Sequence, residues 1–165
     1  MHRRPQIFCA LVGVSLWCAV AAGTQSSSAA TLPESLRTHL KNERLQVVTS
    51  IRGLPLGVRD ELQTLFGTQA LEIADPGAEF QVTDVIRNPQ LPIRRLVTAG
   101  CSIDHCLVYY ERGGIAHSWH VALFRWTPKA TRLEFGGMAP NNLGTIDNVR
   151  AAVLAGTIKD ANRIW

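Results

Sequence analysis

The spacing of hydrophobic residues predicts helices towards both ends of the chain and a run of strands in its centre. Apolar residues recur at helical spacing in residues 33–41, in residues 55–66 and between Thr145 and Gly156. Extended segments are expected at residues 45–50, 80–85, 93–99, 106–111, 115–126 and 131–135. Helices followed by strands and then a helix indicate an α+β fold, with an antiparallel four- to five-stranded meander packed by N-terminal and C-terminal helices.

Two glycines, Gly113 and Gly114, separate two of the apolar runs and predict a two-residue hairpin, because both turn positions would need positive φ. This turn pairs Tyr110 with His117. The better core face would then carry Cys106, Val108, Tyr110, Ile115, His117, Trp119, Val121 and Leu123. The other face would carry Leu107, Tyr109, Glu111, Ser118, His120, Ala122, Phe124 and Trp126. The second face is so aromatic that a helix, a loop or a partner should cover part of it.

Residues 1–30 have the pattern of a secretory signal peptide and its cleavage region. Arg3 and Arg4 precede an uncharged, mostly apolar run over residues 7–22, and a Ser/Ala-rich tract follows at 24–30. The run is shorter than the ~20 residues that a membrane-spanning helix needs, but it has the size of a signal-peptide core. We therefore predict a periplasmic or secreted protein with no stable membrane anchor after cleavage, and a single α+β domain over residues 31–165.

The composition and the charge argue against several classes of protein. Hydrophobic residues make up 46% of the chain and charged residues 18%, which excludes a disordered protein. The net charge of +4 falls to +2 without Arg3 and Arg4, and no Lys/Arg run is present, so we expect no nucleic-acid partner. No phosphate loop, dinucleotide fingerprint or zinc-protease motif occurs, and we expect no cofactor.

Cleavage would leave Cys101 and Cys106 as the cysteines of the exported protein, since Cys9 and Cys18 lie in the signal segment. Two cysteines in an oxidising compartment most simply form one disulfide. Bridged Cα atoms lie about 5.5 Å apart, so the segment between them must turn back on itself.

Such a loop would hold Asp104 and His105 at a rigid tip, where they could bind a partner at little entropic cost. A metal site could instead combine the two thiols with His105 and with His117 or His120. An exported thiol pair tends to oxidise first, so we expect no metal site.

His117, Ser118 and His120 also invite a catalytic interpretation, with Glu111 or Asp104 as the orienting acid. On one strand, however, His117 and His120 point to opposite faces, and no nucleophile elbow precedes Ser118. A small periplasmic hydrolase using His117 or His120 is one alternative function. A second alternative is an accessory subunit that docks through the aromatic sheet face, with Phe124 and Trp126.

The segment Thr98-Ala99-Gly100-Cys101-Ser102-Ile103-Asp104-His105-Cys106 resembles a short loop of the bacterial periplasmic inhibitors of vertebrate lysozyme. In that family a Cys-Lys-Pro-His-Asp-Cys frame, or a close variant, carries a histidine that plugs the lysozyme active site. Here Ser102 and Ile103 replace the Lys-Pro pair, and the acid and the histidine occur in swapped order. Residues 110–117 also resemble a segment of uncharacterised exported bacterial proteins. That second resemblance implies no activity. The resemblance of the Cys101–Cys106 segment to the lysozyme inhibitors implies a non-catalytic inhibitor of a cell-wall-acting enzyme, with Asp104 and His105 as its binding residues.

Overall fold

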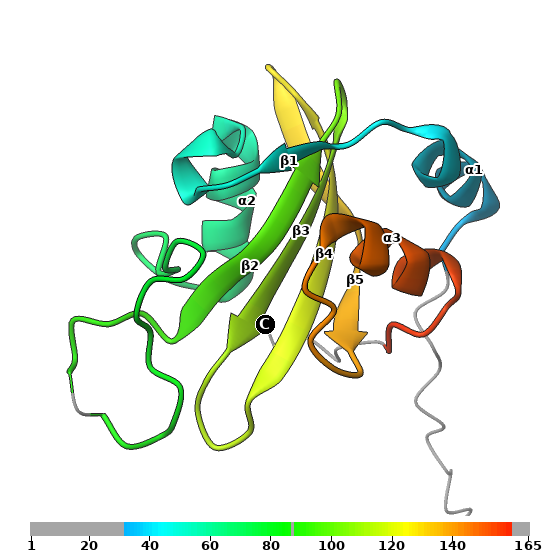
Figure 1. Ribbon diagram of the computed structural model, residues 1–165. Coiled ribbons are helices and arrows are strands. Elements are labelled where there is room, and N and C mark those ends of the chain that lie inside the picture. The colour runs from blue at the N-terminus through cyan, green and yellow to red at the C-terminus, as the bar shows by residue number, and fades with distance from the viewer. Residues whose placement is uncertain (1–31, 87, 160–165) are drawn as a thin grey trace, which may run out of the picture.

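The computed structural model describes residues 32–86 and 88–159, so the predicted signal peptide, with Cys9 and Cys18, lies outside the described residues. Within these ranges the chain forms a five-stranded antiparallel sheet in the order β1-β2-β3-β4-β5, together with three α-helices (Figure 1). The elements are α1 (Glu34–Asn42), β1 (Gln46–Val48), α2 (Leu56–Phe66), β2 (Arg94–Cys101), β3 (His105–Arg112), β4 (Ser118–Thr127), β5 (Ala130–Ala139) and α3 (Ile146–Leu154). An α+β fold with an antiparallel meander is therefore confirmed. None of the helices in the described part is long and apolar enough to cross a membrane.

The helix ends follow the expected local chemistry. Helix α2 ends at Gly67, whose φ of 66° lies in the left-handed region that glycine adopts without strain. Thr145 begins α3, because its hydroxyl oxygen accepts a hydrogen bond from the backbone N–H of Asn148 at 3.3 Å.

Residues 80–85, predicted as an extended piece, form no strand and bend at 83–85. The backbone of this segment forms hydrogen bonds with neighbouring loops and not with a strand of the sheet. The N–H of Gln81 donates to the carbonyl of Pro92 at 2.9 Å, and the carbonyl of Val82 accepts from Gly114 at 3.1 Å.

Helices cover both faces of the sheet, with α2 on one side and α1 and α3 on the other (Figure 1). One core cluster joins α1 and α3 to the sheet and includes Leu36, Leu40, Leu107, Tyr109, Val121, Leu123 and Val149. The other joins α2 to the opposite face and includes Val58, Leu62, Cys106, Val108, Tyr110, Ala122 and Phe124. Both faces are therefore core, so the expected cover over the second face is present as helices of the chain itself, and it is more complete than expected.

The register of the β3–β4 hairpin also differs from the prediction by three residues. Tyr110 pairs with His120 rather than His117, and Cys106 pairs with Phe124. Since side chains alternate along a strand, this odd shift moves every β4 residue to the opposite face. Phe124 is consequently buried under α2, so the aromatic face proposed for docking an accessory subunit is covered by the chain itself.

Gly113 and Gly114 do not form the predicted two-residue turn. The strands are joined by residues 113–117, and of the pair only Gly114 has a positive φ, at 117°. A Cβ on Gly113 would lie 1.8 Å from the carbonyl oxygen of Gln81, so this glycine permits a close approach of two backbones.

The edge strand β5 is partly covered by the chain that follows α3. Met138 and Lys159 form an isolated antiparallel bridge, with N–H to O distances of 2.7 and 2.9 Å in the two directions. Gly137 allows this approach, because a Cβ there would lie 2.2 Å from the carbonyl oxygen of Lys159.

Candidate functional site

The turn between β2 and β3 is closed by a Cys101–Cys106 disulfide, as predicted, with the two Cα atoms 4.1 Å apart. Local hydrogen bonds support the bridge. The N–H of Ser102 donates to the carbonyl of His105 at 2.7 Å, and the N–H of His105 donates to the Ser102 hydroxyl oxygen at 3.1 Å. The N–H of Trp126 on β4 donates to the carbonyl of Asp104 at 2.8 Å. The Cys loop (residues 101–106) is thus held within itself and against β4.

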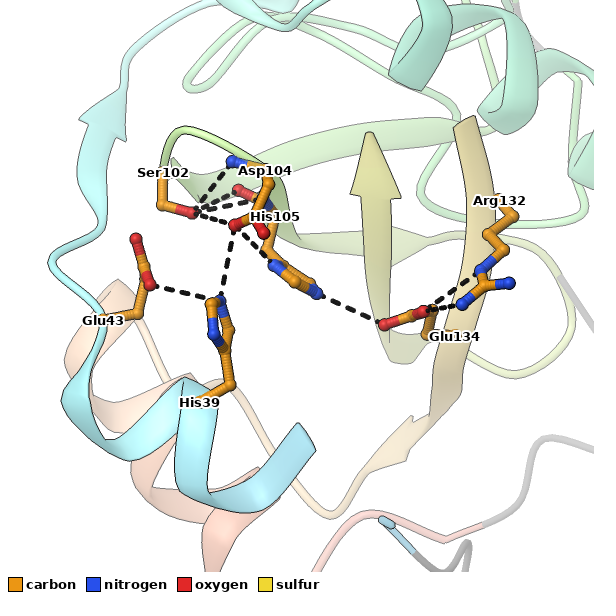
Figure 2. A network of polar contacts seen from close by, with 7 residues as sticks. All are labelled: His39, Glu43, Ser102, Asp104, His105, Arg132 and Glu134. Atoms are coloured by element: carbon orange, nitrogen blue, oxygen red, sulfur yellow. Dashed lines mark hydrogen bonds and ion pairs between the residues drawn. The ribbon is translucent and has the colours of Figure 1, made fainter. Parts of the chain in front are cut away.

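The side chain at the tip of the Cys loop is Ile103, which is 87% exposed. His105, predicted to project there, is only 6% exposed, so that expectation was wrong. His105 already belongs to β3 and pairs with Arg125, and its ring turns away from the tip towards Glu134 (Figure 2). Asp104 stays beside the tip, with its side chain 34% exposed.

Asp104 and His105 line one wall of an open pocket of about 630 Å³, to which α1 and β5 also contribute. We call this space the histidine pocket, and its polar lining consists of Ser35, His39, Asp104, His105, Arg125, Arg132 and Glu134. His39 reaches it from the last turn of α1, where its ring centroid lies 4.2 Å from that of His105.

One carboxylate oxygen of Asp104 lies between the two imidazoles. Asp104 Oδ1 is 2.8 Å from Nδ1 of His105 and 3.4 Å from Nε2 of His39. A second carboxylate oxygen, Oε2 of Glu43 at the end of α1, lies 3.1 Å from the same His39 nitrogen (Figure 2).

Glu134 holds the other side of the His105 ring. Its Oε2 lies 3.3 Å from His105 Nε2, while its Oε1 accepts hydrogen bonds from Arg132 Nε at 3.1 Å and Nη2 at 2.6 Å. Burial alone would raise the pKa of Glu134, but the hydrogen bonds from Arg132 and His105 outweigh it and lower the pKa.

The pKa of Asp104 is lowered in the same way. Burial opposes the shift, while the hydrogen bond and charge of His105 and the charge of His39 favour the carboxylate. Both acids of the pocket are therefore negatively charged at neutral pH.

The candidate catalytic residues at the other end of β3 form two separate pairs. Glu111 Oε2 lies 2.8 Å from His117 Nε2, and the Oε1 of the same carboxylate accepts from Arg95 at 2.7 Å. His120 instead contacts Ser118, whose hydroxyl oxygen lies 2.8 Å from the His120 Nε2. His117 and His120 therefore do not share one site.

The Ser118–His120 pair has little of what a serine hydrolase needs. His120 is fully buried, and burial, followed by the charges of Arg112 and Arg94, lowers its pKa to about 4. A base with that pKa is poorly matched to proton abstraction near neutral pH. The loop amides of Gly113 and Gly114 already donate to the Ile93 and Val82 carbonyls, so they cannot hold an oxyanion. This geometry therefore gives no support to a hydrolase built on Ser118 and His120, whereas Glu111 does lie beside His117, as expected of its orienting acid.

Sequence reasoning missed His39, Glu43 and Glu134. His39 and Glu43 lie four residues apart at the end of a predicted helix, which is the only signal the sequence contained. Nothing in the pattern linked that helix to the Cys loop. The metal alternative built on the thiols is also excluded, because the disulfide uses both sulfur atoms.

Comparisons of this chain with protein-family models, with curated proteins and with solved structures find no match.

Proposed function

We propose that this protein is an exported, non-catalytic binding protein that inhibits a cell-wall-acting glycosidase of the lysozyme type, by inserting the tip of the Cys loop into the enzyme's cleft. The observation that carries the proposal is Ile103, a large apolar side chain that is 87% exposed on a loop closed by a disulfide. Exposed apolar side chains on rigid loops are suited to partner clefts, because little conformational entropy is lost on binding.

The rim of the histidine pocket beside the tip offers charges that complement such a cleft. Glycosidases carry a pair of catalytic carboxyl groups. His105 is buried, and the exposed guanidinium of Arg132 already pairs with Glu134. Exposed donors beside the Cys loop include Arg125 on this rim and Arg44, which lines a neighbouring pocket with Ile103. An arginine can bind a carboxylate through two parallel hydrogen bonds, which gives geometric selectivity as well as affinity.

Inhibition of a panel of lysozymes and bacterial cell-wall glycosidases tests the proposal. Burying an isoleucine contributes about 1.5–3 kcal/mol, so Ile103→Ser should weaken inhibition about 10- to 150-fold. Ile115→Ser is the matched control, because Ile115 is 93% exposed on the hairpin loop between β3 and β4 and should not contact the enzyme. Thermal melting should be unchanged in both variants. Absence of inhibition across the panel, or equal inhibition by wild type and Ile103→Ser, would refute this function.

A further inference from the structure

We propose that His39, Asp104 and His105 form a binding site for one divalent transition-metal ion, best suited to Zn²⁺. This site goes beyond the proposed inhibition, because it lies in the histidine pocket and does not use the Ile103 tip. The nitrogen and oxygen atoms that the three residues can offer lie within 4.8 Å of one another.

The spacing of these atoms fits a tetrahedral ion. Zn²⁺ bonds to imidazole nitrogen and carboxylate oxygen at about 2.0–2.2 Å, so neighbouring ligand atoms lie roughly 3.3 Å apart. Asp104 Oδ1 is 3.4 Å from His39 Nε2 and 2.8 Å from His105 Nδ1. Small side-chain adjustments would bring all three atoms around one centre.

Glu43 can supply a fourth ligand. Its Oε2 is 3.1 Å from His39 Nε2, which is again close to the expected separation of two ligands. The side chain of His39 is 32% exposed and that of Asp104 34%, and the pocket between them is open. The pocket is open to solvent on the Asp104 side, so an ion can enter there, and a small rotation of the His39 ring would turn its buried Nε2 towards the ion. Glu43 then completes a four-coordinate set.

The surroundings of His105 match those of a metal-bound histidine. Such a histidine binds the ion through one ring nitrogen and donates its other N–H to a carboxylate, which fixes the tautomer. With Nδ1 facing Asp104, the Nε2 of His105 lies 3.3 Å from Glu134 Oε2, and Arg132 holds Glu134 in turn. Glu134 is thus a positioning residue rather than a ligand.

The ligand set also selects the class of ion. Imidazole suits Zn²⁺, Cu²⁺ and Ni²⁺, whereas Mg²⁺ and Ca²⁺ prefer sites built from oxygen atoms.

A second imidazole–carboxylate pair in the same chain serves as a comparison. His117 and Glu111 form one imidazole–carboxylate pair at 2.8 Å, but in the histidine pocket one carboxylate oxygen faces two imidazoles. Only the latter arrangement predicts metal binding.

Calorimetric titration of the untagged protein with Zn²⁺ tests the site directly. We expect one ion per chain, no heat of binding with Mg²⁺, and a visible absorption spectrum of low-symmetry Co²⁺ when Co²⁺ is added instead. His39→Ala and Asp104→Asn should abolish saturable binding under the same conditions. His39 and Asp104 are both partly exposed, so these variants should fold, and circular dichroism checks this.

Two further variants separate the ligands from their surroundings. Glu134→Gln should weaken Zn²⁺ affinity about 10- to 100-fold while one ion still binds, as expected for a carboxylate that orients a ligand. His117→Ala is the matched control and should leave the affinity unchanged. Saturable one-to-one binding that survives in both His39→Ala and Asp104→Asn would overturn the proposal, as would failure of the wild type to bind Zn²⁺. Neither outcome bears on inhibition through Ile103.

Discussion

The buried imidazole of His120 should make the protein lose stability as the pH falls below 6.5. Burial, and after it the positive charges of Arg112 and Arg94, lowers the His120 pKa from 6.5 to about 4 in the folded protein. The ring also stacks on Tyr110, with centroids 5.2 Å apart, and has no exposed surface. A protonated ring would therefore lose its hydration by water, and it would also be repelled by the positive charges of Arg112 and Arg94.

The sign and size of the effect follow from proton linkage. The unfolded chain takes up a proton at His120 near pH 6.5, while the folded protein does so only near pH 4, so acid favours unfolding between these values. The free energy of unfolding should fall by about 2 kcal/mol between pH 7 and pH 5, and by close to about 3 kcal/mol between pH 7 and pH 4. The lowered pKa values of Asp104 and Glu134 also favour unfolding in acid, but chiefly below their ordinary values of 3.8 and 4.5.

Urea unfolding followed by tryptophan fluorescence at a series of pH values between 7.5 and 5 measures this loss. His120→Gln should remove about 2 kcal/mol of the pH dependence, whatever its stability at pH 7.5. Ser118→Ala should keep the pH dependence, because burial, and not the Ser118 hydroxyl, is the main cause of the shift. If wild type and His120→Gln lose the same free energy between pH 7 and pH 5, the reasoning is wrong.

Three further predictions concern folding stability, each measured by urea unfolding at pH 7.5. Replacing both Cys101 and Cys106 by Ser should lower the unfolding free energy by about 2 kcal/mol, since a loop this short restrains the unfolded chain only modestly, and an unchanged midpoint would contradict this. Leu62→Ala should cost about 2–5 kcal/mol because Leu62 is fully buried under the sheet, whereas Leu56→Ala, on the exposed side of α2, should stay within about 0.5 kcal/mol; equal costs would show that α2 packs differently. Thr145→Ala should cost about 1 kcal/mol through loss of the α3 cap, and no loss would mean that the Asn148 N–H finds another acceptor.

The sequence was sufficient for the features set by local chemistry. Helix α2 and its end at Gly67, the Thr145 cap of α3, and the Cys101–Cys106 bridge each depend on residues close together in the chain. These interactions form wherever the local backbone permits, so a local pattern predicts them.

The hairpin register and the histidine pocket could not be predicted because they depend on contacts between distant segments. The Gly113-Gly114 pattern predicts a turn, but Gly113 instead lets the backbone of Gln81 approach, and nothing near Gly113 in the sequence indicates that contact. His39 similarly meets Asp104 only after α1 has packed against the sheet. The alternating pattern of β4 is apolar on both faces, so it did not distinguish two registers that differ by an odd number of residues.

The bridge between Met138 and Lys159 affects how the protein behaves in concentrated solution. Strand β5 is the last strand of the sheet, and an open edge of this kind can recruit a strand from another molecule and begin aggregation. The chain after α3 occupies part of that edge, and Gly137 leaves the space it needs. Trimming the protein after Ile158 would remove Lys159 and uncover hydrogen-bonding groups of β5, which should promote self-association, while the helices and the buried Ile158 of the core would be retained.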